Sequence, residues 1–137
     1  MKVVIAGSGN VATVLGRKIL AAGNEIIEIV GRNRESTLAL AALLKSSANY
    51  DSRTVNCNAD IYIICVSDGS IAEVASGLKL NDKIVVHAAA AVSKEVLRSC
   101  GKNYGVLYPL QTLRKELETV PPIPVLIDGN NVHTKKV

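Results

Sequence analysis

Three small residues at the end of an apolar run form the most informative pattern in this sequence. Residues 3–6 are apolar, and Gly7, Gly9 and Ala12 follow them in a Gly-x-Gly-x-x-Ala pattern, the spacing typical of dinucleotide-binding sites. Gly7 suits a tight turn, Gly9 lets the main chain approach a ligand, and Ala12 lets the next helix pack on the strand. Free N–H groups at the start of that helix attract phosphate. The pattern predicts that a dinucleotide pyrophosphate contacts Gly7, Ser8, Gly9, Asn10 and Val11.

The alternative for this turn is a strand-to-helix connection that needs glycines only for its shape. The surrounding pattern favours the nucleotide-binding interpretation, because strand, glycine turn, helix and second strand together occupy about 30 residues, the size of one βαβ unit.

A positive charge stands where many dinucleotide sites carry an acid. An NAD site has Asp or Glu at the end of the second strand, about 20 residues after the glycines, to accept hydrogen bonds from the ribose. Here Arg32 occupies that place, followed by Asn33 and Arg34, and Glu28 comes too early. A guanidinium can hold a 2′-phosphate through two N–H bonds. Arg32 and Asn33 therefore predict NADP(H) as the cofactor; the alternative is a solvated surface arginine.

Two later strands also end in polar residues. Val66, Ser67 and Asp68 are expected beside the cofactor, because loops at the carboxyl ends of parallel strands line the ligand crevice. Asp68 or Ser70 is equally suited to cap the following helix. His87 ends the next strand and is the candidate catalytic residue, able to donate a proton to a carbonyl or imine. A structural histidine is the favoured alternative, since no paired acid is visible.

Apolar periodicity places these residues on alternating strands and helices. Strands are expected at 3–6, 25–30, 60–66, 83–87, 104–108 and 124–128, with a short one near Val55. Helices are expected at 11–22, 38–45, 70–77 and 93–99, with a helical turn at 113–119. Gly23 is suited to end the first helix, and Asn33 or Ser36 to begin the second. This alternation predicts an α/β fold, a doubly wound, mostly parallel Rossmann sheet with helices on both faces.

Composition narrows the function classes. The chain has 137 residues, 48% of them hydrophobic and 20% charged, typical of one globular domain. The net charge of +4 is scattered and there is no Trp or Phe, which argues against nucleic-acid binding. Cys57, Cys65 and Cys100 lack metal-ligand spacing, so no metal is expected, and Cys65 is expected in the core. Without an apolar stretch for a membrane span or signal peptide, we expect a cytoplasmic protein.

Several stretches of this chain occur together in one known family. They are residues 5–12, 31–33, 59–68 and 104–112, together with His87, and the Tyr-Pro-Leu-Gln-Thr run at 108–112 is the most specific of them. Over residues 1–127 the chain resembles the N-terminal domain of a bacterial family of NADP oxidoreductases. That family is related to deazaflavin-dependent NADP oxidoreductases, pyrroline-carboxylate reductases and hydroxyacid dehydrogenases.

The resemblance implies a Rossmann domain over residues 1–128, with the polar residues 129–137 beginning a linker to a helical C-terminal domain. That second domain would form a homodimer and complete the active-site cleft. The resemblance assigns Arg32 to the 2′-phosphate, places Ser67 and His87 near the nicotinamide, and assigns the pyrophosphate to Gly7, Gly9, Asn10 and Val11.

The implied reaction is hydride transfer between the nicotinamide and a small carbonyl, imine or hydroxy compound, with this domain alone inactive. The chain departs from the family after His87, where relatives have Thr or Ser and then Gly, and this chain has four alanines, Ala88–Ala91. A non-catalytic NADP(H) sensor or scaffold is therefore the alternative function.

Overall fold

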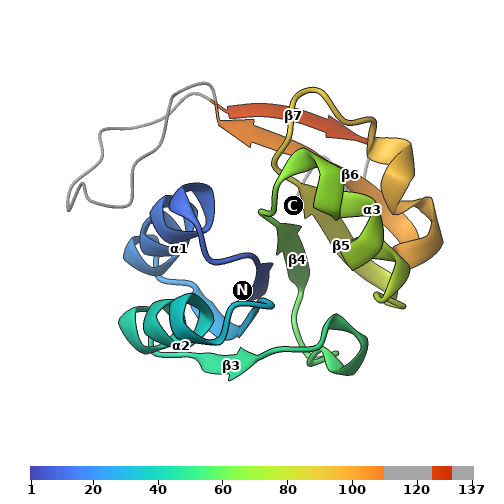
Figure 1. The fold of residues 1–137 in the computed structure, drawn as a ribbon. Helices are drawn as coiled ribbons and strands as arrows, with labels where there is room; N and C mark the ends of the chain where they lie inside the picture. The colour runs from blue at the N-terminus through green and yellow to red at the C-terminus, as the bar shows by residue number, and fades with distance from the viewer. Residues whose placement is uncertain (110–124, 131–137) are drawn as a thin grey trace.

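The computed structural model describes residues 1–109 and 125–130. Its strands are β1 (Lys2–Ala6), β2 (Glu25–Val30), β3 (Ser47–Asn49), β4 (Ile61–Ile64), β5 (Asn81–His87), β6 (Gly101–Pro109) and β7 (Val125–Gly129). Its α-helices are α1 (Asn10–Ala21), α2 (Arg34–Leu43) and α3 (Ile71–Ser76), and its 3₁₀ helices are η1 (Ser52–Thr54), η2 (Asp68–Ser70) and η3 (Lys94–Cys100). Figure 1 shows the arrangement of these elements around the sheet.

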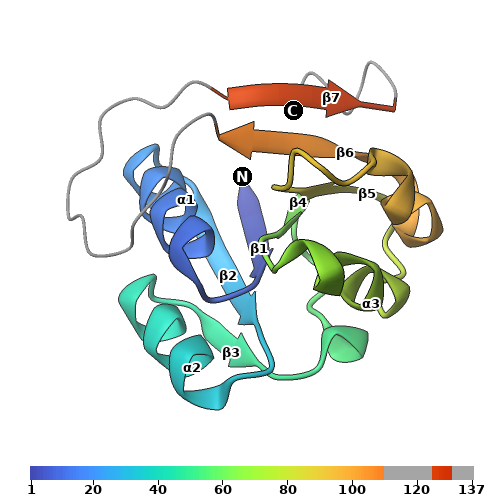
Figure 2. The ribbon, with the colours of Figure 1, turned by 45° about the horizontal axis from the view of Figure 1, so that its top comes forward.

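Within the described residues the strands form one sheet in the order β3-β2-β1-β4-β5-β6-β7. The pairs from β3 to β6 are parallel, and β7 runs antiparallel to β6 at the edge. The predicted doubly wound, mostly parallel Rossmann sheet is confirmed. β1 lies between β2 and β4 (Figure 2), and the chain adds β2 and β3 on one side of β1 and the later strands on the other, so the direction of strand addition reverses at β1. Ligands of such sheets bind outside the carboxyl ends of the strands at this reversal.

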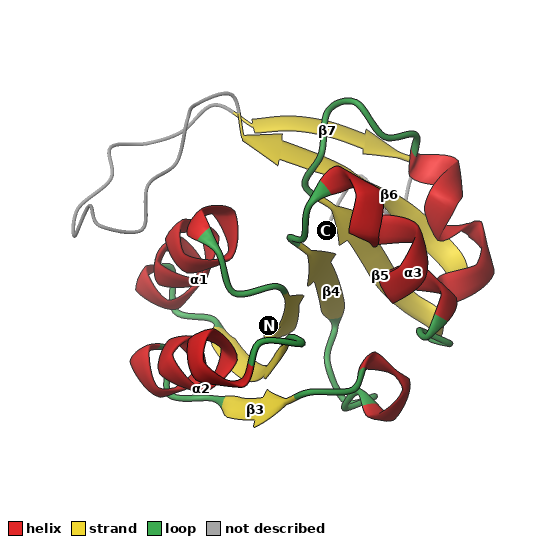
Figure 3. Ribbon diagram, in the orientation of Figure 1, coloured by secondary structure: helices red, strands yellow, loops and turns green. Residues whose placement is uncertain are grey.

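Helices cover both faces of the sheet, as the sequence predicts (Figure 3). Alternate residues of one strand face opposite sides, so Val3 and Ile5 of β1 pack with α1 and α2, whereas Val4 and Ala6 pack with α3 and η3. The strands at the centre are buried on both sides, which explains their near-continuous Val and Ile content. Among the described residues no helix is both long and apolar enough to cross a membrane.

Several expected boundaries are corrected. The short strand expected near Val55 is wrong: β3 lies at Ser47–Asn49, and η1 precedes Val55. The Ser-Ala-Asn sequence of β3 has no apolar pattern, and its extended shape depends on pairing with β2. α2 begins at Arg34, four residues before the expected start, because the Asn33 side chain accepts a hydrogen bond from the Ser36 N–H.

Other expectations agree with the structure or lie outside it. Gly23 follows α1 with a φ of +88°, as expected for the end of a helix. The expected helix at 93–99 is the 3₁₀ helix η3, and the expected edge strand is β7. The helical turn expected at 113–119 and the family stretch at 110–112 lie outside the described residues.

Candidate functional site

The turn after β1 has the shape that the glycine pattern predicts. Gly7 has a φ of +128°, and its N–H donates to the carbonyl of Val30 at the end of β2 (2.7 Å). A β-carbon at position 7 would overlap the carbonyl oxygen of Cys65, so only glycine fits there. Gly9, in contrast, has a φ of −91° and open space where a β-carbon would lie. The turn therefore leaves room for a ligand against Gly9.

α1 begins directly after this turn. Gly9 is its N-cap residue, without a side-chain cap, and the first turn of the helix contains no acidic residue. A helix N-terminus carries partial positive charge and attracts an anion. The hydroxyl groups of Ser8 and Ser36 are hydrogen-bonded at 2.8 Å, which joins the glycine turn to the first turn of α2. Asn10 and Val11 begin α1, so the predicted pyrophosphate residues are contiguous at one helix end.

A cleft of about 480 Å³ lies beside this turn, at the carboxyl ends of β1, β2, β3 and β4. It is lined by Ala6, Val30, Gly31, Arg32, Tyr50, Asp51, Ser52, Arg53, Val66, Glu73, Val74, Ser76 and Gly77. Arg32 and Val66 were predicted from the sequence. The segment 50–53 was not, because the short strand before it was misplaced, and the α3 residues were not because they reach the cleft from a helix. With β3 located at Ser47–Asn49, the carboxyl-end rule would have pointed to residues 50–53.

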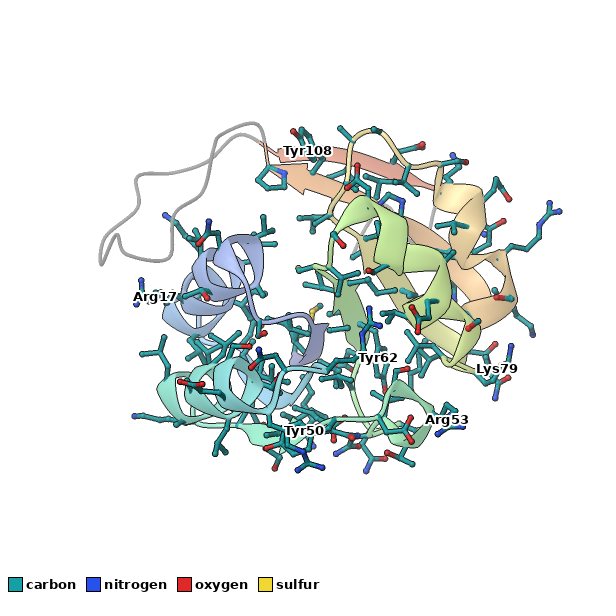
Figure 4. All side chains as sticks on the ribbon, viewed as in Figure 1. Arg17, Tyr50, Arg53, Tyr62, Lys79 and Tyr108 are labelled. Carbon is teal, nitrogen blue, oxygen red and sulfur yellow. The ribbon has the colours of Figure 1, made fainter. Side chains whose placement is uncertain are left out.

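Charged and aromatic side chains contact one another along the wall made by residues 50–53. The Arg53 guanidinium donates to both carboxylate oxygens of Asp51 at 3.1 Å, and these hydrogen bonds lower the pKa of Asp51. The Arg34 guanidinium lies over the Tyr50 ring, 4.4 Å from its centroid. Figure 4 shows Tyr50 and Arg53 on the segment that follows β3. Gly77, at the end of α3, packs closely against this wall: a β-carbon at position 77 would lie 2.7 Å from the Ser52 hydroxyl.

Arg32 joins the two sides of the cleft. Its Nη1 lies 3.4 Å from a carboxylate oxygen of Glu73, and its Nη2 donates to the Ser70 hydroxyl at 3.4 Å. The Arg32 and Glu73 side chains are 70% and 69% exposed, so this ion pair lies at the solvent-facing rim. Asn33, the other residue predicted for the 2′-phosphate, is the N-cap of α2.

Val66, Ser67 and Asp68 follow β4 at the same sheet edge. Val66 lines the cleft, and the Ser67 hydroxyl donates to the Ser70 hydroxyl at 3.1 Å. Ser70 is the N-cap residue of α3, but neither it nor Ser67 makes a side-chain cap hydrogen bond. Asp68 begins η2. Of the two residues suited to cap the helix, Asp68 and Ser70, Ser70 holds the N-cap position without a side-chain cap hydrogen bond, and of Val66, Ser67 and Asp68 only Val66 lines the cleft.

His87 is fully buried, and both of its ring nitrogens contact the main chain. Nδ1 accepts from the Ala89 N–H (3.1 Å), and Nε2 lies 3.3 Å from the Ser93 carbonyl, to which it can donate. Burial lowers the pKa of His87, which favours the neutral ring. In this arrangement the imidazole contacts the main chain at both ends of the loop 88–93. A catalytic role for His87 stays a prediction and requires the Nε2 proton to be released from Ser93.

Two of the three cysteines, Cys65 and Cys100, pack in or against the core, whereas Cys57 is exposed. Cys65 was expected in the core and is partly buried beside the apolar cluster under α1 and α2; burial raises the pKa of its thiol to about 12. Cys100 is buried, its thiol lies 3.3 Å from the Ala75 carbonyl, and its pKa is raised to about 11. Both thiols are therefore protonated near neutral pH, and neither is an activated nucleophile.

These features fit a dinucleotide. The turn at Gly7 admits no side chain, the space at Gly9 is open toward the α1 N-terminus, and the adjoining cleft has both apolar and charged walls. A pyrophosphate would lie on Gly9 and the start of α1, and an adenosine would enter the cleft beside Val30, Val66 and Val74.

Comparison with solved structures identifies similar folds. A Bacteroides fragilis protein described as a "putative NADP oxidoreductase" is 29% identical, with a TM-score of 0.88 and coverage of 98% of this chain and 54% of that chain. Arogenate dehydrogenase of Synechocystis is 14% identical, with a TM-score of 0.74 and coverage of 98% and 51%. Pyrroline-5-carboxylate reductase of Streptococcus pyogenes is 18% identical, with a TM-score of 0.71 and coverage of 99% and 52%. The last two show the fold alone.

The chain spans about half the length of these solved proteins. No curated protein sequence matches it. The family described as "NADP oxidoreductase coenzyme F420-dependent" matches residues 2–91, a range that contains the glycine turn, Arg32 and His87. The chain is an NAD(P)-binding domain with a Rossmann fold, and it belongs to this coenzyme F420-dependent NADP oxidoreductase family.

Proposed function

We propose that this domain binds NADP(H) in preference to NAD(H). The observation that carries the proposal is Arg32, a guanidinium at the end of β2 and at the rim of the cleft, where an NAD site carries an acid. Glu28, the nearest acid in β2, is buried and accepts from the Asn56 N–H (3.0 Å) and the Asn49 amide (3.3 Å). Its carboxylate therefore accepts hydrogen bonds from the end of β3 and the loop after it, and we assign it no hydrogen bond with the ribose.

Each part of the site has a role in this proposal. Gly7 forms the turn, and Gly9 with the start of α1 receives the pyrophosphate. Arg32 pairs with the 2′-phosphate, while Asn33 orders the first turn of α2 beside it. Val66, with Ser67 and Asp68 after it, forms the edge between the adenosine cleft and the nicotinamide side.

The proposed reaction is hydride transfer to or from a small carbonyl, imine or hydroxy compound. Bound NADP(H) would supply the hydride, and the protein would orient it and exclude water. As the family resemblance implies, a helical domain beyond this one would complete the cleft and form the homodimer in which this reaction takes place. Within this chain His87 would position the loop 88–93 through its two main-chain contacts, and this loop would lie beside the nicotinamide.

A non-catalytic NADP(H) sensor is the second candidate. The observation that favours it is the loop after β5, where Ala88–Ala91 carry no functional side chains and both His87 nitrogens are engaged. NADPH oxidation should be measured with the longest natural chain across a panel of carbonyls and imines. Tight binding without turnover would favour the sensor, and turnover would exclude it.

The test of cofactor preference is a calorimetric titration with NADPH and NADH. Arg32→Ala should weaken NADPH binding by about 1.5–3 kcal/mol, the typical contribution of a charge-assisted hydrogen bond, and leave NADH nearly unchanged. Arg98→Ala is the matched control, because Arg98 is exposed on η3 and pairs with Glu95 outside the cleft. An equal loss for both cofactors would refute the 2′-phosphate assignment, and failure of the wild type to bind either would refute the dinucleotide site.

A further inference from the structure

We propose that Glu73 competes with the cofactor's 2′-phosphate for Arg32, and thereby sets how strongly the site prefers NADP(H) over NAD(H). The inference rests on the proposed function, since it assigns a partner to Arg32 when no 2′-phosphate is bound. Glu73 comes from α3, on the far side of the cleft from Arg32. It is a specificity-determining residue in this proposal, not a proton carrier.

The contacts show how Arg32 is occupied. Nη1 pairs with the Glu73 carboxylate and Nη2 donates to the Ser70 hydroxyl, both at 3.4 Å. Ser70 is itself held by the Ser67 hydroxyl at 3.1 Å. Both terminal nitrogens of the guanidinium therefore point at η2 and α3. A phosphate that binds across Nη1 and Nη2 through two parallel N–H bonds would compete with both of these partners.

The negative charge of Glu73 also opposes a bound 2′-phosphate, as its contact with Arg32 does. A 2′-phosphate beside Arg32 would lie close to this carboxylate, and like charges at short range repel. NAD(H) carries a hydroxyl at the same position, which can donate a hydrogen bond to a carboxylate. Glu73 thus penalises NADP(H) and is neutral or favourable for NAD(H). The preference created by Arg32 is reduced by Glu73.

The pair is suited to exchange partners because it is exposed. About 70% of each side chain is in solvent. An ion pair this exposed changes the binding constant of a competing ligand by only about one- to fivefold. Such a pair orders Arg32 at the rim but yields to a phosphate, which offers more acceptors and more charge. Glu73 also lines the cleft itself, so a bound adenosine would enter beside the ion pair.

Equilibrium titrations of wild type and Glu73→Gln test the proposal. Four probes separate the 2′-phosphate from the rest of the cofactor: NADPH, NADH, 2′,5′-ADP and 5′-AMP. Glu73→Gln should bind NADPH and 2′,5′-ADP about two- to fivefold more tightly, and NADH and 5′-AMP no more tightly than wild type. The gain should shrink at about 0.5 M salt, because exposed charges are screened.

Two further variants sharpen the result. Asp82→Asn removes one negative charge at the start of β5, where Asp82 pairs with Lys102 at 3.4 Å outside the cleft, and should leave all four affinities unchanged. In an Arg32→Ala background, Glu73→Gln should produce a smaller gain for NADPH than in wild type, because the competition is gone. Thermal unfolding by circular dichroism checks that each variant is folded.

The outcomes separate this inference from the proposed function. If wild type binds NADPH and Arg32→Ala loses it selectively, but Glu73→Gln brings no gain or an equal gain for all probes, only the competition is overturned. A selective loss in Glu73→Gln would overturn it as well, because Glu73 would then be orienting Arg32 for the phosphate. If wild type shows no preference for NADPH, the proposed function is wrong; a selective NADPH gain in Glu73→Gln would then still support the competition, and the absence of that gain would overturn it too.

Discussion

The main chain of Gly7 lies directly against the carbonyl group of Cys65, the residue that follows β4. The Cys65 N–H donates to the Ala6 carbonyl at 2.6 Å, which holds the two segments together across the point where the strand order reverses. A β-carbon at position 7 has no space beside this backbone. The site geometry and the packing of the central strands therefore depend on the same glycine.

Gly7→Ala should destabilise the domain by about 2–4 kcal/mol, because it combines a disfavoured positive φ with an overlap against rigid backbone. Urea unfolding followed by circular dichroism measures the change. Gly23→Ala is a useful comparison: Gly23 also has a positive φ, +88°, but open space at its β-carbon position. A loss at Gly7 no larger than at Gly23 would contradict the packing argument.

Gly9→Ala should separate binding from stability. The new methyl group meets no atom within 4 Å, and the φ of −91° is accessible to alanine, so unfolding free energy should change by only about 1 kcal/mol. The same methyl group would occupy the space through which a pyrophosphate approaches, and we expect NADPH affinity to fall by about tenfold or more. Calorimetric titration measures the affinity; unchanged NADPH binding would place the pyrophosphate elsewhere.

Thr37→Val should be neutral or stabilising by about 1 kcal/mol, because the buried Thr37 hydroxyl has no hydrogen-bond partner among the described residues. Thr13→Val is the matched control. Thr13 is also buried, but its hydroxyl donates to the Gly9 carbonyl at 2.7 Å, so its removal should cost about 0.5–1.5 kcal/mol. Urea unfolding of both variants decides; a loss at Thr37 as large as at Thr13 would show that its hydroxyl is satisfied.

His87 should make the folded state less stable in acid. Burial lowers the pKa of His87 in the folded state below its ordinary value of 6.5, so the unfolded chain takes up a proton first as the pH falls. The contribution is fully present above about pH 6.5 and is lost as the pH falls through the lower, folded-state pKa. Unfolding free energies of wild type and His87→Gln between about pH 7.5 and pH 5 check this.

The glutamine variant should be less stable at neutral pH, because it replaces a ring that contacts Ala89 and Ser93. Its slope of stability against pH should nevertheless be shallower than that of wild type in the acid range. Equal slopes for the two proteins would contradict a lowered pKa of His87 in the folded state.

The central strands, the glycine turn and the start of α1 were predictable from the sequence because their signals are local. Apolar runs, glycine spacing and a capping residue such as Asn33 act within a few positions of one another. Arg32 was identified for the same reason, since its place after β2 is counted along the chain. The reversal of strand order then follows from the general rules of parallel sheets.

The tertiary structure decided what those residues contact. β3 is a polar segment that becomes a strand only by pairing with β2, and it carries residues 50–53 to the cleft. Arg32 meets Ser70 and Glu73 across 38 and more positions of sequence, and no local pattern specifies that pairing. His87 likewise finds its partners through the path of the loop 88–93. Local periodicity shows which elements form, whereas the cleft depends on long-range packing that brings separate elements together.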